Sequence, residues 1–203
     1  PDEIEEASGF TLFGRRIKSL IYTTDVAVIR NSNADAIFAV YPFTAQPAIT
    51  QALLTASEAP VFVGVGGGMT NGDRSVRLAE FSEHQGASGV VVNAPISNET
   101  IAKMKAVVDI PVVTTIVSGD MDIAGRLAAG ADILNVSGAS RTPEIVTKIR
   151  AEFPTVPIIA TGGPREEDIL RTIEAGANAI TYTPPTTGQL FADIMISHRK
   201  NFS

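Results

Sequence analysis

The sequence predicts a (β/α)8 barrel, the TIM-barrel fold, as a single domain of a short variety, and three observations predict it. Eight apolar runs alternate with helical patterns along 203 residues. Seven of these runs open either with a proline or after a small-residue step, and the two kinds of opening alternate along the chain. The runs carry Val and Ile on successive residues, as strands buried on both faces of a parallel sheet do. Alternating strands and helices of this kind favour a closed barrel.

The two kinds of strand opening have separate physical causes. The proline runs begin at Ala59, Ile110 and Val156, and proline is tolerated at the first residue of a strand because its missing N–H disturbs no hydrogen-bond ladder. The other kind follows steps such as "AGAD" and "AGAN", whose glycine suits the left-handed residue that ends a helix. The expected strands are 15–24, 33–42, 59–67, 86–95, 110–118, 130–138, 156–163 and 176–184.

The segments between the runs have helical patterns. They open near Asn, Asp, Ser or Thr, and several carry Glu early, as helix N-termini prefer. A doubly wound open sheet is the alternative, but an open sheet needs edge strands and none of the well-defined runs has that pattern. We expect residues 1–14 to form an N-terminal extension and 15–203 to form the barrel. The expected helices are 47–58, 73–86, 98–108, 120–130, 142–153 and 165–176.

Composition excludes several classes of function. Hydrophobic residues make up 44% and the net charge is −6, with 16 basic residues scattered among 22 acidic ones, so we expect no nucleic-acid partner. The absence of cysteine removes disulfides and thiolate sites. Apolar stretches fall short of the roughly 20 residues that cross a bilayer, and the beginning lacks a secretory signal. A cytoplasmic protein without a membrane partner is expected, and the start at Pro1 leaves open whether residues precede it.

The chemistry of such barrels lies at the C-terminal ends of the strands. Counting from each strand-opening proline, or from the alanine of each small-residue step, predicts which residues reach this mouth. Residues two apart share a face of a strand, so Asn135 and Ser137 should point the same way. The second half of the predicted mouth is polar and the first half is apolar or glycine. The predicted rim is Phe38, Val40, Gly64, Val91, Asn93, Thr115, Asn135, Ser137, Thr161, Thr181 and Thr183.

A phosphate site is predicted after the seventh and eighth strands. Loops there frequently bind phosphate in this fold, through backbone N–H groups and a helix N-terminus. Glycine allows close approach of the backbone, and threonine adds a hydroxyl donor. Plain tight turns are the alternative, because the two prolines of "TPPTT" remove amide donors. The predicted phosphate-binding residues are Gly138, Gly162, Gly163, Thr183 and Thr186.

The stretch "PIIATGGPREEDILRTIEAGANAITYT" resembles the final two units of the ribulose-phosphate-binding barrels, the phosphate-binding TIM-barrel superfamily. The whole chain is also similar to small bacterial barrels catalogued only as hydrolases, a label that names no reaction. The first resemblance implies a small anionic, phosphorylated molecule bound through Gly162, Gly163 and Thr183. It transfers no catalytic residue, since a fold does not determine a function.

Few candidate catalytic residues follow the strands. Asp25 and Asp120 are candidates for moving protons, although Asp25 could equally cap a short first helix and a cap or first-turn role is the alternative for Asp120. Asn93 and Asn135 are expected to hold polar substrate atoms. Arg141 follows the sixth strand, where a guanidinium can clamp a carboxylate or phosphate. The strand ends carry no lysine suited to a Schiff base, and we expect no metal and no cofactor.

Two functions therefore remain open from the sequence. The first is an enzyme, a lyase, isomerase or hydrolase, acting on a phosphorylated metabolite. The second is a non-catalytic or regulatory barrel that binds such a metabolite, which the lack of His, Lys and Glu at the strand ends favours. The glycine-rich segment "VGVGGGMTNGDRS" is expected to be a functional loop in either case. A homo-oligomer is a further possibility.

Overall fold

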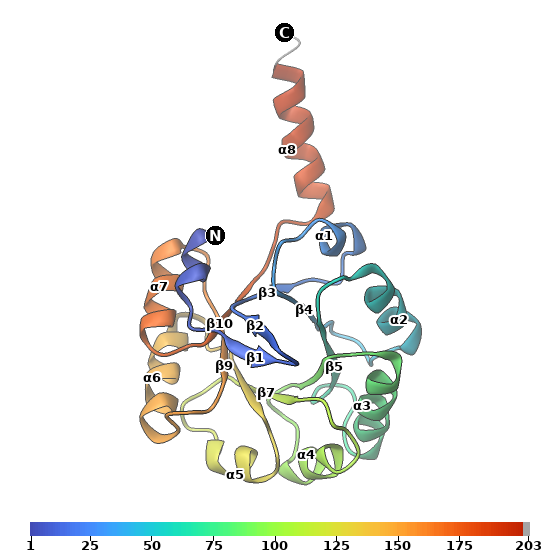
Figure 1. Ribbon diagram of the computed structural model, residues 1–203, viewed down its shortest axis with the longest axis vertical. Helices are drawn as coiled ribbons and strands as arrows, with labels where there is room; N and C mark the ends of the chain where they lie inside the picture. The colour runs from blue at the N-terminus through green and yellow to red at the C-terminus, as the bar shows by residue number, and fades with distance from the viewer. Residues whose placement is uncertain (201–203) are drawn as a thin grey trace.

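A computed structural model describes residues 1–200 as a closed (β/α)8 barrel (Figure 1), which confirms the predicted fold. Every neighbouring pair of barrel strands is parallel, and β10 closes the ring by pairing with β3. The open-sheet alternative is therefore wrong. The barrel strands are β3 (Ser19–Tyr22), β4 (Ala36–Ala39), β5 (Val61–Gly66), β6 (Gly89–Val92), β7 (Val112–Ile116), β8 (Ile133–Val136), β9 (Ile158–Thr161) and β10 (Ala179–Tyr182).

The first predicted strand, 15–24, is in fact two strands with different partners. β2 (Arg15–Ile17) pairs antiparallel with β1 (Phe10–Leu12), and only β3 joins the barrel. The hairpin turn places Phe13 and Gly14 at φ 46° and 79°, as tight two-residue hairpin turns require. Phe10, Leu12 and Ile17 are buried with the side chains of the barrel interior. The hairpin thus closes the end of the barrel opposite the mouth.

Helices follow seven of the barrel strands around the outside of the sheet, and several begin where the sequence predicts. Asp25, Ser97 and Asp122 accept hydrogen bonds from the first backbone N–H groups of α1, α4 and α5, as N-caps do. The short helix η1 (Asp2–Glu6) packs beside α7. The helices are α1 (Val26–Arg30), α2 (Pro47–Ala56), α3 (Asp73–Gln85), α4 (Asn98–Lys105), α5 (Ile123–Ala128), α6 (Thr142–Glu152), α7 (Glu166–Glu174) and α8 (Thr187–Lys200), with the 3-10 turn η2 (Ala139–Arg141) before α6.

The core has an inner and an outer part, because alternate residues of each strand point into the barrel or toward the helices. Phe38, Phe62 and Val91 fill the interior together with the hairpin. Ile37 and Val90, one residue away, lie in the layer between the sheet and the helices. The inward residues at the strand ends are therefore the ones that form the mouth.

The last helix does not cover the barrel. α8 extends away from the other elements (Figure 1), and no side chain in its described length is buried. The outer face of β10 and β3 consequently lacks the helix that completes the ring in an ordinary (β/α)8 barrel. Within residues 1–200, no helix is long and apolar enough to cross a membrane.

Candidate functional site

A cavity of about 420 Å³ opens at the mouth of the barrel. We call it the mouth cavity. Its floor is made of inward residues at the ends of β3 to β8, and the loops after β4 and β5 form one of its walls. It is lined by Tyr22, Phe38, Val40, Tyr41, Pro42, Phe43, Thr44, Ala45, Gly64, Gly66, Gly68, Met69, Thr70, Val91, Asn93, Thr115, Asn135 and Ser137.

One side of the mouth cavity is polar and uncharged. Asn135 and Thr115 are nearly buried, and the Asn135 amide donates to the Thr115 hydroxyl over 3.3 Å. On the next strands, the Thr161 hydroxyl donates to the Ser137 hydroxyl over 3.4 Å. The buried Thr181 hydroxyl on β10 has no hydrogen-bond partner among the described residues. Of these residues, Thr115, Asn135 and Ser137 line the mouth cavity, and their hydroxyl and amide groups can donate to, or accept from, a ligand.

The opposite side of the mouth cavity is apolar and aromatic. The rings of Tyr22 and Phe38 lie 6.3 Å apart, within the range of favourable aromatic contact. Gly64 leaves room here, because a Cβ at this position would lie 3.3 Å from the Val40 side chain. Phe43 is 67% exposed although it lines the cavity. A ligand with an apolar part can bury surface against this wall.

The glycine-rich segment after β5 forms part of the rim. Gly67 adopts φ +92°, and the Asn93 N–H donates to the carbonyl of Gly66 over 2.9 Å. The hydroxyls of Thr44 and Thr70 are 2.6 Å apart and join the loops after β4 and β5. The segment is thus an ordered wall of the mouth cavity, and its predicted role as a functional loop stays a prediction.

The structure separates the five predicted catalytic residues. Asn93 and Asn135 line the mouth cavity, whereas Asp25, Asp120 and Arg141 do not. The Asp120 side chain is 90% exposed and lies 3.5 Å from the Lys148 ammonium group. Arg141 is exposed and paired at 3.3 Å with the Glu144 carboxylate, whose hydrogen bonds raise the pKa of the guanidinium.

Asp25 caps α1 and also holds the beginning of α8. Its carboxylate accepts from the N–H groups of Ala27 and Val28 and from the Thr187 hydroxyl. The hydrogen bond from Thr187 is the largest cause that lowers the pKa of Asp25, and the two backbone hydrogen bonds add to it. A carboxylate held ionised in this way is a weak base, because an efficient general base needs a pKa near the working pH.

Replacing Thr187 with valine is expected to raise the pKa of Asp25. A lowered carboxyl pKa stabilises the folded state above the unfolded pKa, and this contribution is lost as the pH falls through the folded pKa. The variant should therefore be less stable than the parent at pH 7, and this difference should shrink in acid. Urea unfolding across pH 3–7 and an NMR titration of Asp25 measure both effects. Thr186→Val is the control, because the Thr186 hydroxyl bonds to Gln189; an unchanged Asp25 pKa in Thr187→Val would contradict the assignment.

The five predicted phosphate-binding residues lie at the same end of the barrel but do not line the mouth cavity. Gly162 and Gly138 have packing reasons to be glycine, since a Cβ would lie 2.7 Å from the Ile180 side chain and 2.4 Å from that of Ile145. Gly163 adopts φ +83° in the turn before α7. The first turn of α7 carries Glu166, Glu167 and Asp168, which reduces its attraction for an anion. Thr183 and Thr186 are exposed, and phosphate binding by this set stays a prediction.

Counting along the repeat found most of the strand residues of the mouth cavity, but of its aromatic wall it found only Phe38. Tyr22, Tyr41, Phe43 and Met69 come from the end of β3 and from the loops after β4 and β5. Loop residues have no place in a strand repeat, so the periodic pattern carried no signal for them. The exception is Tyr22, which lies two residues after the inward Leu20 and could have been placed by strand alternation.

Comparison with solved structures finds the same fold in known enzymes. The chain is similar to 2,3-dimethylmalate lyase, a PEP mutase/isocitrate lyase superfamily member, with 14% identity, a TM-score of 0.69, and coverage of 98% of this chain and 84% of that one. Oxaloacetate acetylhydrolase gives 13% identity, a TM-score of 0.69, and coverage of 96% and 82%. Phosphonopyruvate hydrolase in complex with oxalate and Mg++ gives 15% identity, a TM-score of 0.66, and coverage of 97% of this chain and 84% of that one. At these identities the likeness establishes the shared barrel.

No protein-family model matches the chain, and no curated protein sequence matches it. One structural neighbour, 2,3-dimethylmalate lyase, bears the name of the PEP mutase/isocitrate lyase superfamily, whereas the sequence resemblance pointed to the ribulose-phosphate-binding barrels. The (β/α)8 barrel is common to both. The comparisons over the whole chain therefore support the shared barrel and neither superfamily in particular.

The described lining of the mouth cavity offers no carboxylate ligand for a cation such as the Mg++ found in the structure of one neighbour. Hard cations take carboxylate and carbonyl oxygens as ligands, and no carboxylate or imidazole belongs to the described lining. Within residues 1–200 there is also no group of three or more His, Cys, Asp or Glu side chains placed to hold a metal ion. The described lining therefore does not fit a divalent cation, and no catalytic step is assigned to one.

Proposed function

We propose that the mouth cavity binds a small metabolite carrying a carboxylate or phosphate group, and that the protein acts on it as an enzyme. The observation that carries this proposal is the two-sided lining of the cavity, polar on β7 and β8 and aromatic on β3 and β4. Ligand sites in this fold lie at this end of the strands. The names of the structural neighbours, which include lyases and hydrolases, support the enzymatic part.

The polar side would hold the anionic oxygens of the ligand. The amide of Asn135 and the hydroxyls of Thr115 and Ser137 can each direct a hydrogen at an oxygen, and hydrogen bonds to a charged group are the stronger kind. The apolar part of the ligand would lie against Tyr22 and Phe38. A phosphate at the polar edge would reach Gly162 and Gly163, which follow Thr161 in the chain.

The acidic first turn of α7 favours a carboxylate over a phosphate dianion. Glu166, Glu167 and Asp168 stand in the first turn of α7, which follows the predicted phosphate loop. Arg165 forms an ion pair with Asp168 at 2.9 Å, so Glu166 and Glu167 are the charges that repel an anion. No lysine, arginine or histidine belongs to the described lining of the mouth cavity to offset this repulsion. A carboxylate carries a smaller negative charge than a phosphate dianion. The neutral donors of the mouth cavity can therefore hold it against less repulsion.

The second candidate function is binding without chemistry. It is favoured by the uncharged lining, because proton transfer needs a group with a pKa near the working pH. Within the described lining, the phenols of Tyr22 and Tyr41 are the groups able to exchange a proton, and the Tyr41 hydroxyl already accepts from the N–H of Gln46. That bond leaves the Tyr41 O–H free to donate, so both phenols are candidates for the acid or base, and Tyr22, whose ring lies 6.3 Å from that of Phe38, is the one tested first.

A calorimetric titration separates these functions. The probes are oxalate, pyruvate, phosphoenolpyruvate, ribose 5-phosphate and inorganic phosphate, each followed by NMR for chemical change. Asn135→Leu and Thr115→Val should each weaken binding about tenfold or more, because a hydrogen bond to a charged group contributes about 1.5–3 kcal/mol. Thr114→Val is the matched control, since Thr114 is buried on the other face of β7 and its hydroxyl has no partner among the described residues.

The outcomes distinguish the two candidates from each other and from failure. Binding with turnover that Tyr22→Phe abolishes supports the enzyme. Binding without turnover of any probe supports the binding barrel. Binding of none of the probes, or equal weakening by Thr114→Val and Thr115→Val, would overturn the assignment of the mouth cavity as a ligand site.

A further inference from the structure

A line of aromatic rings runs from the interior of the barrel to the mouth cavity. The rings of Phe62 and Phe38 lie 6.2 Å apart, and those of Phe38 and Tyr22 lie 6.3 Å apart. Exposure rises along this line, from 0% for Phe62 and 2% for Phe38 to 39% for Tyr22. The last ring lines the cavity, so a further aromatic ring bound there can make a contact of the same kind with it.

Two further apolar side chains stand at the rim of the mouth cavity and are largely exposed. Phe43 is 67% exposed and Met69 is 80% exposed, and both line the cavity. We call this pair the apolar rim. Its residues belong to the loops after β4 and β5, which the hydroxyls of Thr44 and Thr70 join over 2.6 Å. Exposed apolar groups gathered at one cavity mark a surface that a ligand covers, and the flexible thioether of methionine adapts to what it packs against.

The size and the charge of the mouth cavity limit what its ligand can be. The volume of about 420 Å³ lies within the range of about 300–1,000 Å³ for pockets that enclose drug-sized ligands. An acid that meets only Thr115, Asn135 and Ser137 leaves the rest of the lining, most of it apolar or aromatic, uncovered. No lysine, arginine or histidine belongs to the described lining, so a charge held against the apolar part would be buried without a partner, which is costly. The part of the ligand beyond its carboxylate is therefore uncharged.

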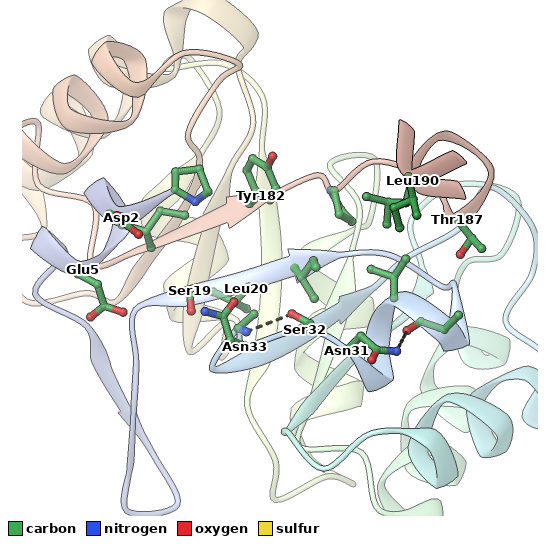
Figure 2. Close-up of a pocket in the computed structure, with 18 of the residues that line it drawn as sticks. Asp2, Glu5, Ser19, Leu20, Asn31, Ser32, Asn33, Tyr182, Thr187 and Leu190 are labelled. Carbon is green, nitrogen blue, oxygen red and sulfur yellow. Dashed lines mark hydrogen bonds between the residues drawn. The ribbon is translucent and has the colours of Figure 1, made fainter. Parts of the chain in front are cut away.

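A second cavity, of about 550 Å³, lies on the outside of the barrel beside β10 and β3, and its lining also includes apolar residues. Figure 2 shows Tyr182 and Leu190 in this cavity, with Asp2 of η1 at its border. It shares no lining residue with the mouth cavity among those described. Asn31 lines it as well, so the amide signals of Asn31 report whether a molecule binds there instead.

We propose that the ligand of the mouth cavity is an aromatic monocarboxylate. Its carboxylate accepts hydrogen bonds from Thr115, Asn135 and Ser137, and its ring packs against Tyr22 and is covered by the apolar rim. The ring extends the line of aromatic contacts that begins inside the barrel, and it buries the side chains that the empty cavity leaves exposed. This inference rests on the proposed function, because it names the class of ligand for the same site.

Calorimetric and NMR titrations with matched pairs of acids test the proposal. The pairs are acetate with phenylacetate and pyruvate with phenylpyruvate, and cyclohexylacetate is a nonaromatic reference of similar size. The aromatic acid of each pair should bind about 10- to 100-fold more tightly than the short one, because it buries a ring. Phenylacetate should bind at least about twofold more tightly than cyclohexylacetate, although the cyclohexyl group is no less apolar, because aromatic pairs gain more than their buried area. The Asn135 side-chain amide should shift in a saturable way, and the Asn31 amides should not.

Variants of the apolar rim locate the bound ring. Phe43→Ser and Met69→Ser should each weaken the binding of phenylacetate about fivefold or more. They should leave the binding of acetate unchanged, because acetate reaches only the polar side of the cavity. Phe81→Ser is the matched control, since Phe81 is 52% exposed on α3 and does not line the mouth cavity, and it should change neither affinity. All three side chains are exposed, so the variants should fold, which circular dichroism checks.

The outcomes separate a failure of this inference from a failure of the proposed function. Short and aromatic acids that bind equally tightly, or a Phe43→Ser change that weakens acetate and phenylacetate alike, would overturn the aromatic ligand and leave the mouth cavity as a carboxylate site. Cyclohexylacetate that binds as tightly as phenylacetate would overturn it too, as would phenylacetate that shifts Asn31 rather than Asn135. If no acid binds, the inference fails, and the proposed function fails with it unless inorganic phosphate binds instead.

Discussion

Replacing Phe62 with alanine is expected to lower the free energy of unfolding by about 3–5 kcal/mol, the range for large-to-small changes at aromatic core positions. The Phe62 side chain is fully buried in the barrel interior, and its ring lies 6.2 Å from that of Phe38. A closed barrel has little freedom to collapse around the lost ring, so the cavity persists. Urea unfolding measures the loss. Phe81→Ala on the exposed face of α3 should change stability by no more than about 0.5 kcal/mol.

Gly89, which faces the Phe62 ring, offers a sharper test of packing inside the barrel. A Cβ on Gly89 would lie 2.4 Å from the Phe62 ring, so Gly89→Ala should destabilise the parent by about 1–3 kcal/mol through overpacking. In the Phe62→Ala background the added methyl group occupies vacated space. The effect of Gly89→Ala should therefore become neutral or stabilising in that background, a coupling that a double-mutant cycle detects. Additive effects would show that the two residues do not meet inside the barrel.

Replacing Gly67 with alanine is expected to cost about 2–3 kcal/mol and to disturb the mouth cavity. Its φ of +92° is a conformation that residues with a Cβ rarely adopt, and a Cβ there would lie 2.5 Å from the Asn93 carbonyl oxygen. Strained backbone of this kind costs about 1–3 kcal/mol, and the collision is with backbone atoms that cannot rotate away. Thermal and urea unfolding measure the stability.

Gly68→Ala is the matched control for this change. The next residue has open space around it, with no heavy atom within 4 Å of the position of a Cβ. Gly68→Ala should leave stability within about 0.5 kcal/mol of the parent. If both glycines tolerate alanine equally, the wall of the mouth cavity is not built by the contact between Gly67 and Asn93.

The fold was predictable because each strand has a local signal that the barrel needs. A proline at a strand start, such as Pro157, and a glycine at a helix end, such as Gly86 at φ 107°, place boundaries without reference to tertiary structure. The hairpin Phe10–Ile17 was not predictable in this way. Only Lys18 lies between β2 and β3, so the two strands read as one continuous run, and the left-handed turn at Phe13 and Gly14 separates β1 from β2.

The candidate site was predictable where the strand repeat fixes direction and not elsewhere. Asn135 and Thr115 point into the mouth cavity because strand alternation puts them there. Asp25 follows a strand and precedes a helix, a position equally suited to an N-cap and to a catalytic base, and the sequence cannot distinguish them.

The most direct test of the ligand site is the NMR signal of the Asn135 side-chain amide, assigned by its loss in Asn135→Leu. On addition of oxalate or phosphoenolpyruvate, this signal and the backbone amides of Thr115 and Ser137 should shift in a saturable way. Residues outside the mouth cavity, such as Asn31 at the end of α1, should not shift. Saturable changes elsewhere with an unmoved Asn135 amide would contradict the account.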